Sequence, residues 1–266
     1  MTTRLEIYRE APSWNGLRTA AIGTGLCADA ESGAAFLNEA CETLRKKGIQ
    51  AVVGPMDGST WGKYRLPVWT DGSPGFLMEP DAGPDDLAAY EKAGFEIAEL
   101  HASATAKPGS RGYAEAVKGI VVEAWNGEDA EALLASAHEL VMDGFRTTPF
   151  FTPVPLEIFL QRYMPLLAHA DPRFILRALD SDSKARGLTL AFPDPLRKGA
   201  VVLKTYVGAV PGAGRAMADR VHGLAEEHGF SEVIHALMRA GIASEAQSRK
   251  FGGTVFRRYA LMGRLL

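Results

Sequence analysis

Residues 201–214 read VVLKTYVGAVPGAG, a run typical of a β-strand followed by a tight glycine turn. The residues after it place Met217, Val221 and Leu224 on one face at helical spacing, so they predict an amphipathic helix that ends at Gly229. A glycine turn between a strand and a helix presents unpaired backbone N–H groups at the positive end of the helix dipole, where phosphate groups bind. Glycine serves equally well in a plain tight crossover, so the stretch predicts a strand–turn–helix unit with either role.

Two common nucleotide motifs are missing from this turn. No Gly-Lys-Ser/Thr run follows it, which argues against a P-loop, and Met217 stands where a dinucleotide fingerprint needs a third glycine.

The composition is ordinary for a soluble globular protein, with 47% hydrophobic and 23% charged residues among 266. A formal net charge of -3 and the lack of a Lys/Arg cluster argue against a nucleic-acid partner. No apolar run approaches the roughly 20 residues of a membrane span. No secretory signal precedes Cys27 and Cys41, and the histidines show no zinc-binding pattern. We therefore expect a cytoplasmic protein with no metal and no membrane contact.

The second half of the chain alternates strand and helix signals. Strands are expected at 119–124, 173–179, 188–192, 201–210 and 233–238, and helices at 126–142, 152–169 and 215–228. A short helix and a last strand that contains Tyr259 complete the order β-α-α-β-β-β-α-β-α-β.

The first half repeats this order with its beginning missing. Strands are expected at 4–10 and 17–27 around an Asn15-Gly16 hairpin turn, then a helix at 32–47 and a strand at 49–53. Residues 57–85 are expected to be irregular, and a short helix and a strand at 96–102 follow them. Two similar orders in one chain indicate an internal duplication.

This order and several motifs resemble the GNAT superfamily of acyl-CoA N-acyltransferases, in its tandem-repeat bacterial form. YEKAGF at 90–95 matches the closing Y-x-x-x-G-F of a repeat, and GPMD at 54–57 and STW at 59–61 are also similar to tandem members. PGAGRA at 211–216 matches part of the Q/R-x-x-G-x-G/A pyrophosphate turn, with Pro211 in the Gln/Arg place. The resemblance implies an α/β (α+β) fold of two GNAT-like mixed sheets flanked by helices. Residues 1–103 would form a truncated repeat, 104–112 a linker and 113–266 a complete repeat.

The resemblance implies one site for acetyl-CoA or another acyl-CoA, in the second repeat. The implied cofactor-binding residues are Val207, Ala209, Gly212, Ala213, Gly214, Arg215, Ala216 and Ser244. Ser244 also starts a Ser-x-x-Gln capping box, and we favour a helix cap for it. The corresponding turn of the first repeat carries Asp29 and Glu31, whose charges would repel a pyrophosphate.

In such enzymes a neutral amine attacks a thioester, which requires a base for the amine proton and an acid for the leaving thiolate. Ser248 takes the place of the family's usual tyrosine acid and is one catalytic candidate. His235, expected in a strand beside the cleft, is the other, because a histidine titrates near neutral pH; a histidine hydrogen-bonded within the sheet is equally expected. Tyr90 keeps the motif's tyrosine in the first repeat, where we expect it to pack against the core.

Large aromatic and basic residues in loops are the candidates for binding the acceptor, an unidentified small amine. Trp61, Tyr64 and Arg65 lie in the irregular segment of the first repeat, and Phe150 lies between the first two helices of the second. If the two repeats face each other, the first of these segments would wall the acceptor site.

Three functions remain open. The chain could be an acyl-CoA-dependent N-acyltransferase, acting alone or as a homodimer. It could be a non-catalytic GNAT-like protein that binds CoA or a small ligand, which the missing tyrosine and the partial turn favour. A tRNA-dependent aminoacyl transferase is the third, and the net charge of -3 argues against it, because such a protein needs a basic face.

Overall fold

The computed structural model describes residues 5–25 and 27–266, with no account of the side chains of Thr205 and Tyr206. The first half consists of β1 (Ile7–Tyr8), β2 (Thr19–Ile22), α1 (Ala30–Arg45), β3 (Ala51–Gly54), β4 (Leu66–Thr70), α2 (Asp86–Lys92) and β5 (Glu96–Ala106). The second half consists of β6 (Val121–Ala124), α3 (Ala130–Gly144), α4 (Leu156–Leu167), a 3-10 turn (Pro172–Phe174), β7 (Ile175–Leu179), β8 (Ala185–Pro193), β9 (Ala200–Gly208), α5 (Ala213–Glu227), β10 (Glu232–Arg239), α6 (Ala243–Lys250) and β11 (Thr254–Leu265).

Most elements lie where periodicity and turn residues predict them. Asn15 and Gly16 both have positive φ (53° and 78°), and the amide of Leu17 donates to the Trp14 carbonyl at 3.0 Å, as a tight hairpin turn requires. β1 and β2 pair antiparallel beyond this turn, with Ile7 opposite Ile22. Leu26, expected in the second of these strands, lies outside the described residues.

Two local expectations are wrong. The segment 57–85, expected to be irregular, contains β4, which sits off the main strand order and pairs with β11. Its sequence LPVWT includes a proline, which removes a backbone donor and is tolerated at a sheet edge. In addition, β5 runs through Ala106, so residues 104–106 of the expected linker belong to a strand.

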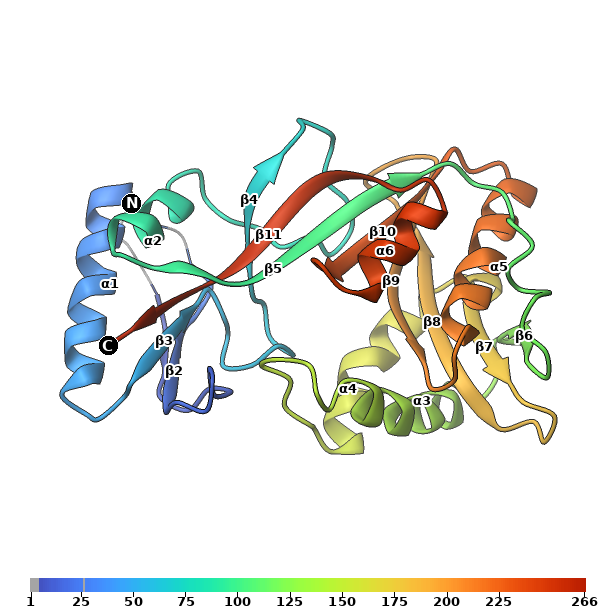
Figure 1. The fold of residues 1–266 in the computed structure, drawn as a ribbon, viewed down its shortest axis with the longest axis horizontal. Coiled ribbons are helices and arrows are strands. Elements are labelled where there is room, and N and C mark those ends of the chain that lie inside the picture. Colours follow the sequence, from blue (N-terminus) through green and yellow to red (C-terminus); the bar gives the residue numbers. More distant parts are fainter. Residues whose placement is uncertain (1–4, 26) are drawn as a thin grey trace.

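The strands form one continuous mixed sheet rather than the two sheets expected. The order is β1-β2-β3-β11-β5-β10-β9-β8-β7-β6. β5, the last strand of the first half, pairs antiparallel with β10 of the second half, and β11, the last strand of the chain, pairs antiparallel with β3 of the first half. β5 and β11 run side by side across the middle of the molecule (Figure 1). Each half therefore lends its closing strand to the other, a long-range exchange that local sequence patterns do not encode.

Helices cover both faces of the second half of the sheet. α5 packs on one face, where Met217 and Val221 meet Leu203 of β9. α3 and α4 pack on the other face around Phe159, Leu190 and Val207. Up to Leu203, successive β9 residues point to opposite faces, so Leu203 faces α5 while Val202 joins a cluster that contains Phe76 and Tyr259. The register with β8 then shifts between Leu203 and Thr205, and beyond this bulge Val207 faces α3.

Candidate active site

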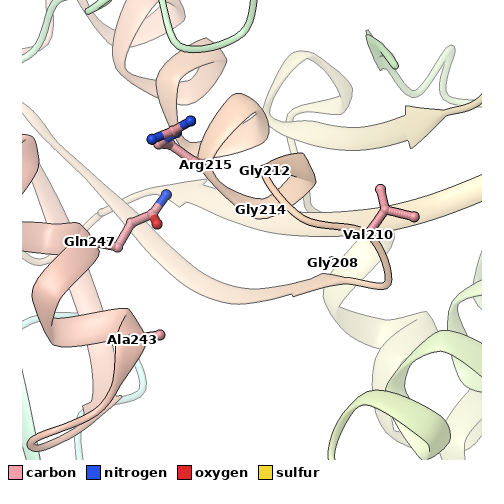
Figure 2. Close-up of a pocket in the computed structure, with 7 residues that line it drawn as sticks. All are labelled: Gly208, Val210, Gly212, Gly214, Arg215, Ala243 and Gln247. Atoms are coloured by element: carbon pink, nitrogen blue, oxygen red, sulfur yellow. The ribbon is translucent and has the colours of Figure 1, made fainter. Parts of the chain in front are cut away.

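A cavity of ≈ 390 Å³ opens between the start of α5 and α6 (Figure 2). Its walls come from the end of β9, the glycine turn and one side of α6: Gly208, Val210, Gly212, Gly214, Arg215, Ala243 and Gln247. Arg215 reaches toward it from α5, and Gln247 from α6. The glycine turn at 211–214 thus lines this cavity.

The turn offers backbone donors to this cavity. The amide of Ala213 donates to the Val210 carbonyl at 3.2 Å and that of Ala216 to the Gly212 carbonyl at 2.9 Å. Within the described part of the chain, the amides of Gly214 and Arg215 have no acceptor, as expected in the first turn of a helix. Two free N–H groups at the positive end of α5 suit a phosphate group.

Two further features of the turn suit an anionic ligand with a thin arm. The Arg215 guanidinium lies 5.0 Å from the Tyr113 ring centroid, and its Nε is buried with no hydrogen-bond partner. A Cβ at Gly208 would meet the Gly214 amide nitrogen at 2.8 Å, so only glycine allows β9 to approach the turn this closely.

β9 and β10 separate next to this cavity. They pair in parallel from Ala200 opposite Glu232 up to Leu203 opposite His235, where the register ends. Beyond that point β9 continues beside β8, with Gly208 opposite Gly187, and β10 continues beside β5. The open edge of β9 therefore leads from the glycine turn toward the middle of the sheet.

The structure places some of the residues expected to bind the cofactor at the cavity and others away from it. Gly212, Gly214 and Arg215 line the cavity. The amides of Ala213 and Ala216 are engaged within the turn, and the Ala209 amide donates to the Arg186 carbonyl at 2.8 Å, so these three amides are not free for a ligand. The Val207 side chain packs against α3, so only its backbone groups on β9 could contact a ligand.

Ser244 does not cap a helix. α6 begins at Ala243 and its N-cap is Ile242, whose side chain accepts no hydrogen bond; the Glu245 carboxylate instead accepts from the Gly241 amide at 2.8 Å. Among the described residues, Ala243 and Gln247 line the cavity, whereas Ser244 does not. The capping box fails because the helix starts two residues earlier than that motif requires.

Ser248 and His235, the two catalytic candidates, touch each other and extend to a third residue. The Ser248 Oγ lies 2.7 Å from His235 Nδ1, and His235 Nε2 lies 2.8 Å from His222 Nε2. His222 Nδ1 in turn lies 3.1 Å from the Lys107 carbonyl oxygen. The three side chains are at most 5% exposed, and the Phe251 ring stacks on His222 at 4.6 Å.

The Lys107 carbonyl, at the end of this series of hydrogen bonds, determines which nitrogen of each histidine carries a proton. Burial lowers the pKa of His222 to about 4 and that of His235 to about 3, so both rings are neutral at pH 7. The Lys107 carbonyl can only accept, so His222 Nδ1 carries its proton and its Nε2 accepts from His235. His235 Nδ1 must then accept from the Ser248 hydroxyl. We call Ser248, His235 and His222 the relay.

The relay depends on close packing around Ser248. A Cβ at Gly253 would stand 2.1 Å from the Ser248 Oγ, so that position has no room for a side chain. Gln247, the neighbour of Ser248 on α6, lines the cavity, which places this end of the relay beside it. His222 was not a sequence candidate, although it adjoins the apolar stripe of α5, where a histidine indicates a buried and partnered ring.

The corresponding turn of the first half is filled by the protein itself. Asp29 caps α1 by accepting from the Ser32 amide at 2.8 Å, and this hydrogen bond lowers the pKa of Asp29. Asp86 accepts from the Cys27 amide at 2.8 Å. Tyr90, 2% exposed, packs edge-on against Phe95 at 5.1 Å, consistent with its expected place in the core. Backbone donors that a phosphate would need here bind carboxylates instead.

Two of the acceptor candidates hold the halves together. The Trp61 indole N–H donates to the Thr152 carbonyl at 2.6 Å, and its ring contacts Phe151 and Phe159 of the second half. Phe150 is buried against Met56 and other core residues of the first half. Their polar and apolar groups are therefore used in packing between the halves. The other two acceptor candidates, Tyr64 and Arg65, contact each other instead. The Arg65 guanidinium lies 3.8 Å above the Tyr64 ring and is itself buried.

Two kinds of feature are missing from the described residues. No group of three or more His, Cys, Asp or Glu side chains among them could hold a metal ion. No helix in the described ranges is long and apolar enough to cross a membrane.

Comparisons with known proteins establish the fold. No protein-family model matches the chain, and no curated protein matches it in sequence. A GCN5-related N-acetyltransferase from Sphaerobacter thermophilus superposes with a TM-score of 0.60 over 99% of this chain and 76% of its own, at 14% identity. A tandem GNAT protein from the clavulanic acid biosynthesis pathway gives 0.51 over 94% and 76%, at 12% identity. A GCN5-related N-acetyltransferase from Anabaena variabilis gives 0.53 over 98% and 59%, at 14% identity. The chain has the GNAT fold, as its sequence predicted.

Proposed function

We propose that this protein transfers an acyl group from acetyl-CoA or another acyl-CoA to a small amine. The observation that carries the proposal is that one cavity has free helix-terminal amides on one side and the neighbour of a buried Ser–His–His relay on the other. Phosphate binding and proton transfer are the two things that thioester aminolysis on a CoA carrier requires.

Each part of the cavity suits one part of the cosubstrate. The amides of Gly214 and Arg215, with the Arg215 guanidinium, would hold the pyrophosphate. The pantetheine arm would follow the open edge of β9, because unpaired strand groups can bind an extended chain. The thioester would then lie near the point where β9 and β10 separate, next to Leu203 and His235.

The relay would move one proton out and back. As the amine nitrogen forms its bond to the thioester carbon, its proton passes to the Ser248 Oγ, while the serine proton moves to His235 Nδ1. The Nε2 proton of His235 moves to His222, which becomes an imidazolium that still donates to the Lys107 carbonyl. When the C–S bond breaks, the reverse shift lets Ser248 protonate the thiolate. The products are the amide and CoA, with protons balanced and no covalent enzyme intermediate.

A protein that binds CoA without turnover is the second candidate. Pro211 removes one backbone donor from the turn, and a serine alone is a poor acid. The relay supports the enzyme over the binder, because the neutral His235 accepts from the Ser248 hydroxyl and His222 follows in line, which gives the serine proton a path.

Turnover with a panel of amines tests the proposal. CoA thiol release would be followed with a thiol reagent, with acetyl-CoA and each amine in turn, and products identified by mass spectrometry. We expect release to depend on at least one amine and to stop when that amine is acylated. Tight acetyl-CoA binding with no amine-dependent release across the panel would instead identify a binder.

A further inference from the structure

Arg65 is a buried cation that lacks a direct ion pair. Its side chain is 7% exposed, and in the described part of the chain its guanidinium makes no hydrogen bond and no ion pair. Its Nε is fully enclosed, its guanidinium lies 3.8 Å from the Tyr64 ring centroid, and Glu99 acts on it only from beyond ion-pair distance. Burial lowers the pKa of Arg65 to about 9, which leaves the group charged at neutral pH. A buried charge without a partner is strongly unfavourable in a protein that binds nothing there.

The backbone holds this side chain in place. Arg65 has a φ of 77°, a region that residues other than glycine rarely adopt, and its amide donates to the Pro55 carbonyl at 2.9 Å. The conformation turns the chain just before β4 and sets the guanidinium between the halves.

The surroundings of Arg65 carry an excess of positive charge. Lys204, on β9, is close enough for Arg65 to contribute, after burial, to lowering its pKa to about 8. Its Nζ donates to the Met78 carbonyl at 2.8 Å. Two carboxylates are near enough to act on these cations, Glu99 on Arg65 and Glu79 on Lys204, but the ion pairs that they form are with Arg239 at 3.2 Å and Arg257 at 2.7 Å. Four basic side chains thus share two carboxylates, which leaves an excess of positive charge around Arg65 and Lys204.

This excess charge lies next to the proposed reaction centre. Lys204 is the first β9 residue beyond the last pair with β10, Leu203 opposite His235. Its side chain lies on the sheet face away from α5, because its Nζ is 5.9 Å from the centroid of the Phe76 ring, which packs with Val202 on that face.

We propose that Arg65 and Lys204 bind an anionic group, a carboxylate or a phosphate, on the acceptor amine. The acceptor is then an amine that also carries a negative charge, such as an amino acid or an aminoalkyl phosphate. The planar fork of Arg65 binds two oxygens of such a group, and Lys204 adds a point charge. The inference rests on the proposed function only in that it identifies the ligand as the acceptor amine. Anion binding at this site does not require turnover.

Ligand-dependent unfolding with matched probes tests the site. The thermal midpoint of the acetyl-CoA-loaded protein would be measured with glycine against glycinamide and with O-phosphoethanolamine against ethanolamine, at equal ionic strength. We expect the anionic member of one pair to raise the midpoint and its neutral counterpart not to do so. A shift with glycine identifies a carboxylate site, and a shift with the phosphate identifies a phosphate site.

Variants separate a ligand site from a structural arginine. Arg65→Met should raise the midpoint of the free protein, because it removes an unpaired buried charge, and should abolish the anion-dependent shift. Arg65→Lys should keep the fold and weaken anion binding at least tenfold. Arg162→Met, which removes the same charge from an exposed helix position, should change neither property. A lower midpoint for Arg65→Met together with an undiminished anion shift in Arg65→Lys would overturn the proposal, as would equal responses to both members of each pair.

Failure of the anion-site proposal and failure of the transferase proposal give different results. If anion binding depends on Arg65 but no amine is acylated, the site stands and the transferase proposal falls. If amines are acylated with equal efficiency whether or not they carry an anion, the transferase stands and the Arg65 site falls.

Discussion

Lowering the pH from 7.5 to 5 is expected to remove up to about 6 kcal/mol from the free energy of unfolding. The reason is three buried histidines with depressed pKa values: His222 near 4, His235 near 3 and His101 near 2, each lowered mainly by burial. In the unfolded chain each takes up a proton near pH 6.5, whereas the folded protein keeps all three neutral until the pH is far lower. Below pH 6.5 protons therefore favour unfolding, by about 2 kcal/mol per histidine at pH 5.

Other groups change this window little. The carboxyl groups of Asp29, Asp171 and Asp180 have pKa values below their usual range, so their contribution is lost only at lower pH. Glu99 works in the opposite direction, because burial raises its pKa and the folded state binds its proton first. It offsets part of the loss.

Urea unfolding at several pH values between 7.5 and 5 measures this effect. His222→Gln should reduce the slope of stability against pH by about one proton, whatever it does to stability at pH 7.5. His169→Gln, at an exposed position, should leave the slope unchanged. A free energy of unfolding that stays constant to within about 1 kcal/mol across this range would contradict the buried, neutral histidines.

Ser248→Ala is expected to lower kcat by about 100-fold or more with little change in acetyl-CoA affinity. Its hydroxyl ends the relay on α6, the helix whose Gln247 lines the cavity, so its loss removes the proposed proton acceptor and donor, while the glycine turn that would hold the cofactor is untouched. The measurement is steady-state kinetics with the acceptor found in the amine panel, together with calorimetric titration of acetyl-CoA.

Controls distinguish a relay from a merely packed serine. Ser136→Ala removes an exposed helix serine that donates to the Leu133 carbonyl, and it should leave kcat unchanged. The double variant Ser248→Ala with His235→Gln should be no slower than Ser248→Ala alone, because the two groups act as a unit. If Ser248→Ala keeps kcat within a factor of about three, the relay has no part in the chemistry.

The local elements of this fold are readable from sequence, and the strand exchange is not. The Asn15-Gly16 hairpin, α1 ending before Gly48 and α5 ending before Gly229 follow from turn residues and helical spacing, and both of those glycines have positive φ. β5 and β11 were expected as strands within their own halves. Their pairing with β10 and β3 depends on contacts more than a hundred residues apart, which no local pattern contains.

The site shows the same division. Gly212, Gly214 and Arg215 were predicted from a sequence motif, and the structure places them around one cavity. Ser248 and His235 were separate candidates, and their contact became visible only when α6 and β10 were placed together. The lack of an ion pair at Arg65 is harder still to predict, because it depends on Arg257 and Arg239 of the second half, which pair with Glu79 and Glu99. Sequence supplies the chemical groups, whereas the absence of a partner is a property of the assembled fold.

The central claim is that acyl-CoA binds at the glycine turn, and thermal unfolding with excess acetyl-CoA tests it most directly. At a concentration 100 times the dissociation constant, a ligand of the folded state adds about 2.7 kcal/mol to stability. Gly214→Glu should keep the fold, since a carboxylate suits the start of a helix, but should repel the pyrophosphate. Ala132→Glu, which adds the same charge to the start of α3, should retain the full shift. A shift in the native protein and in Ala132→Glu that vanishes in Gly214→Glu is the predicted result. No shift at millimolar acetyl-CoA, or an equal shift in Gly214→Glu, would contradict it.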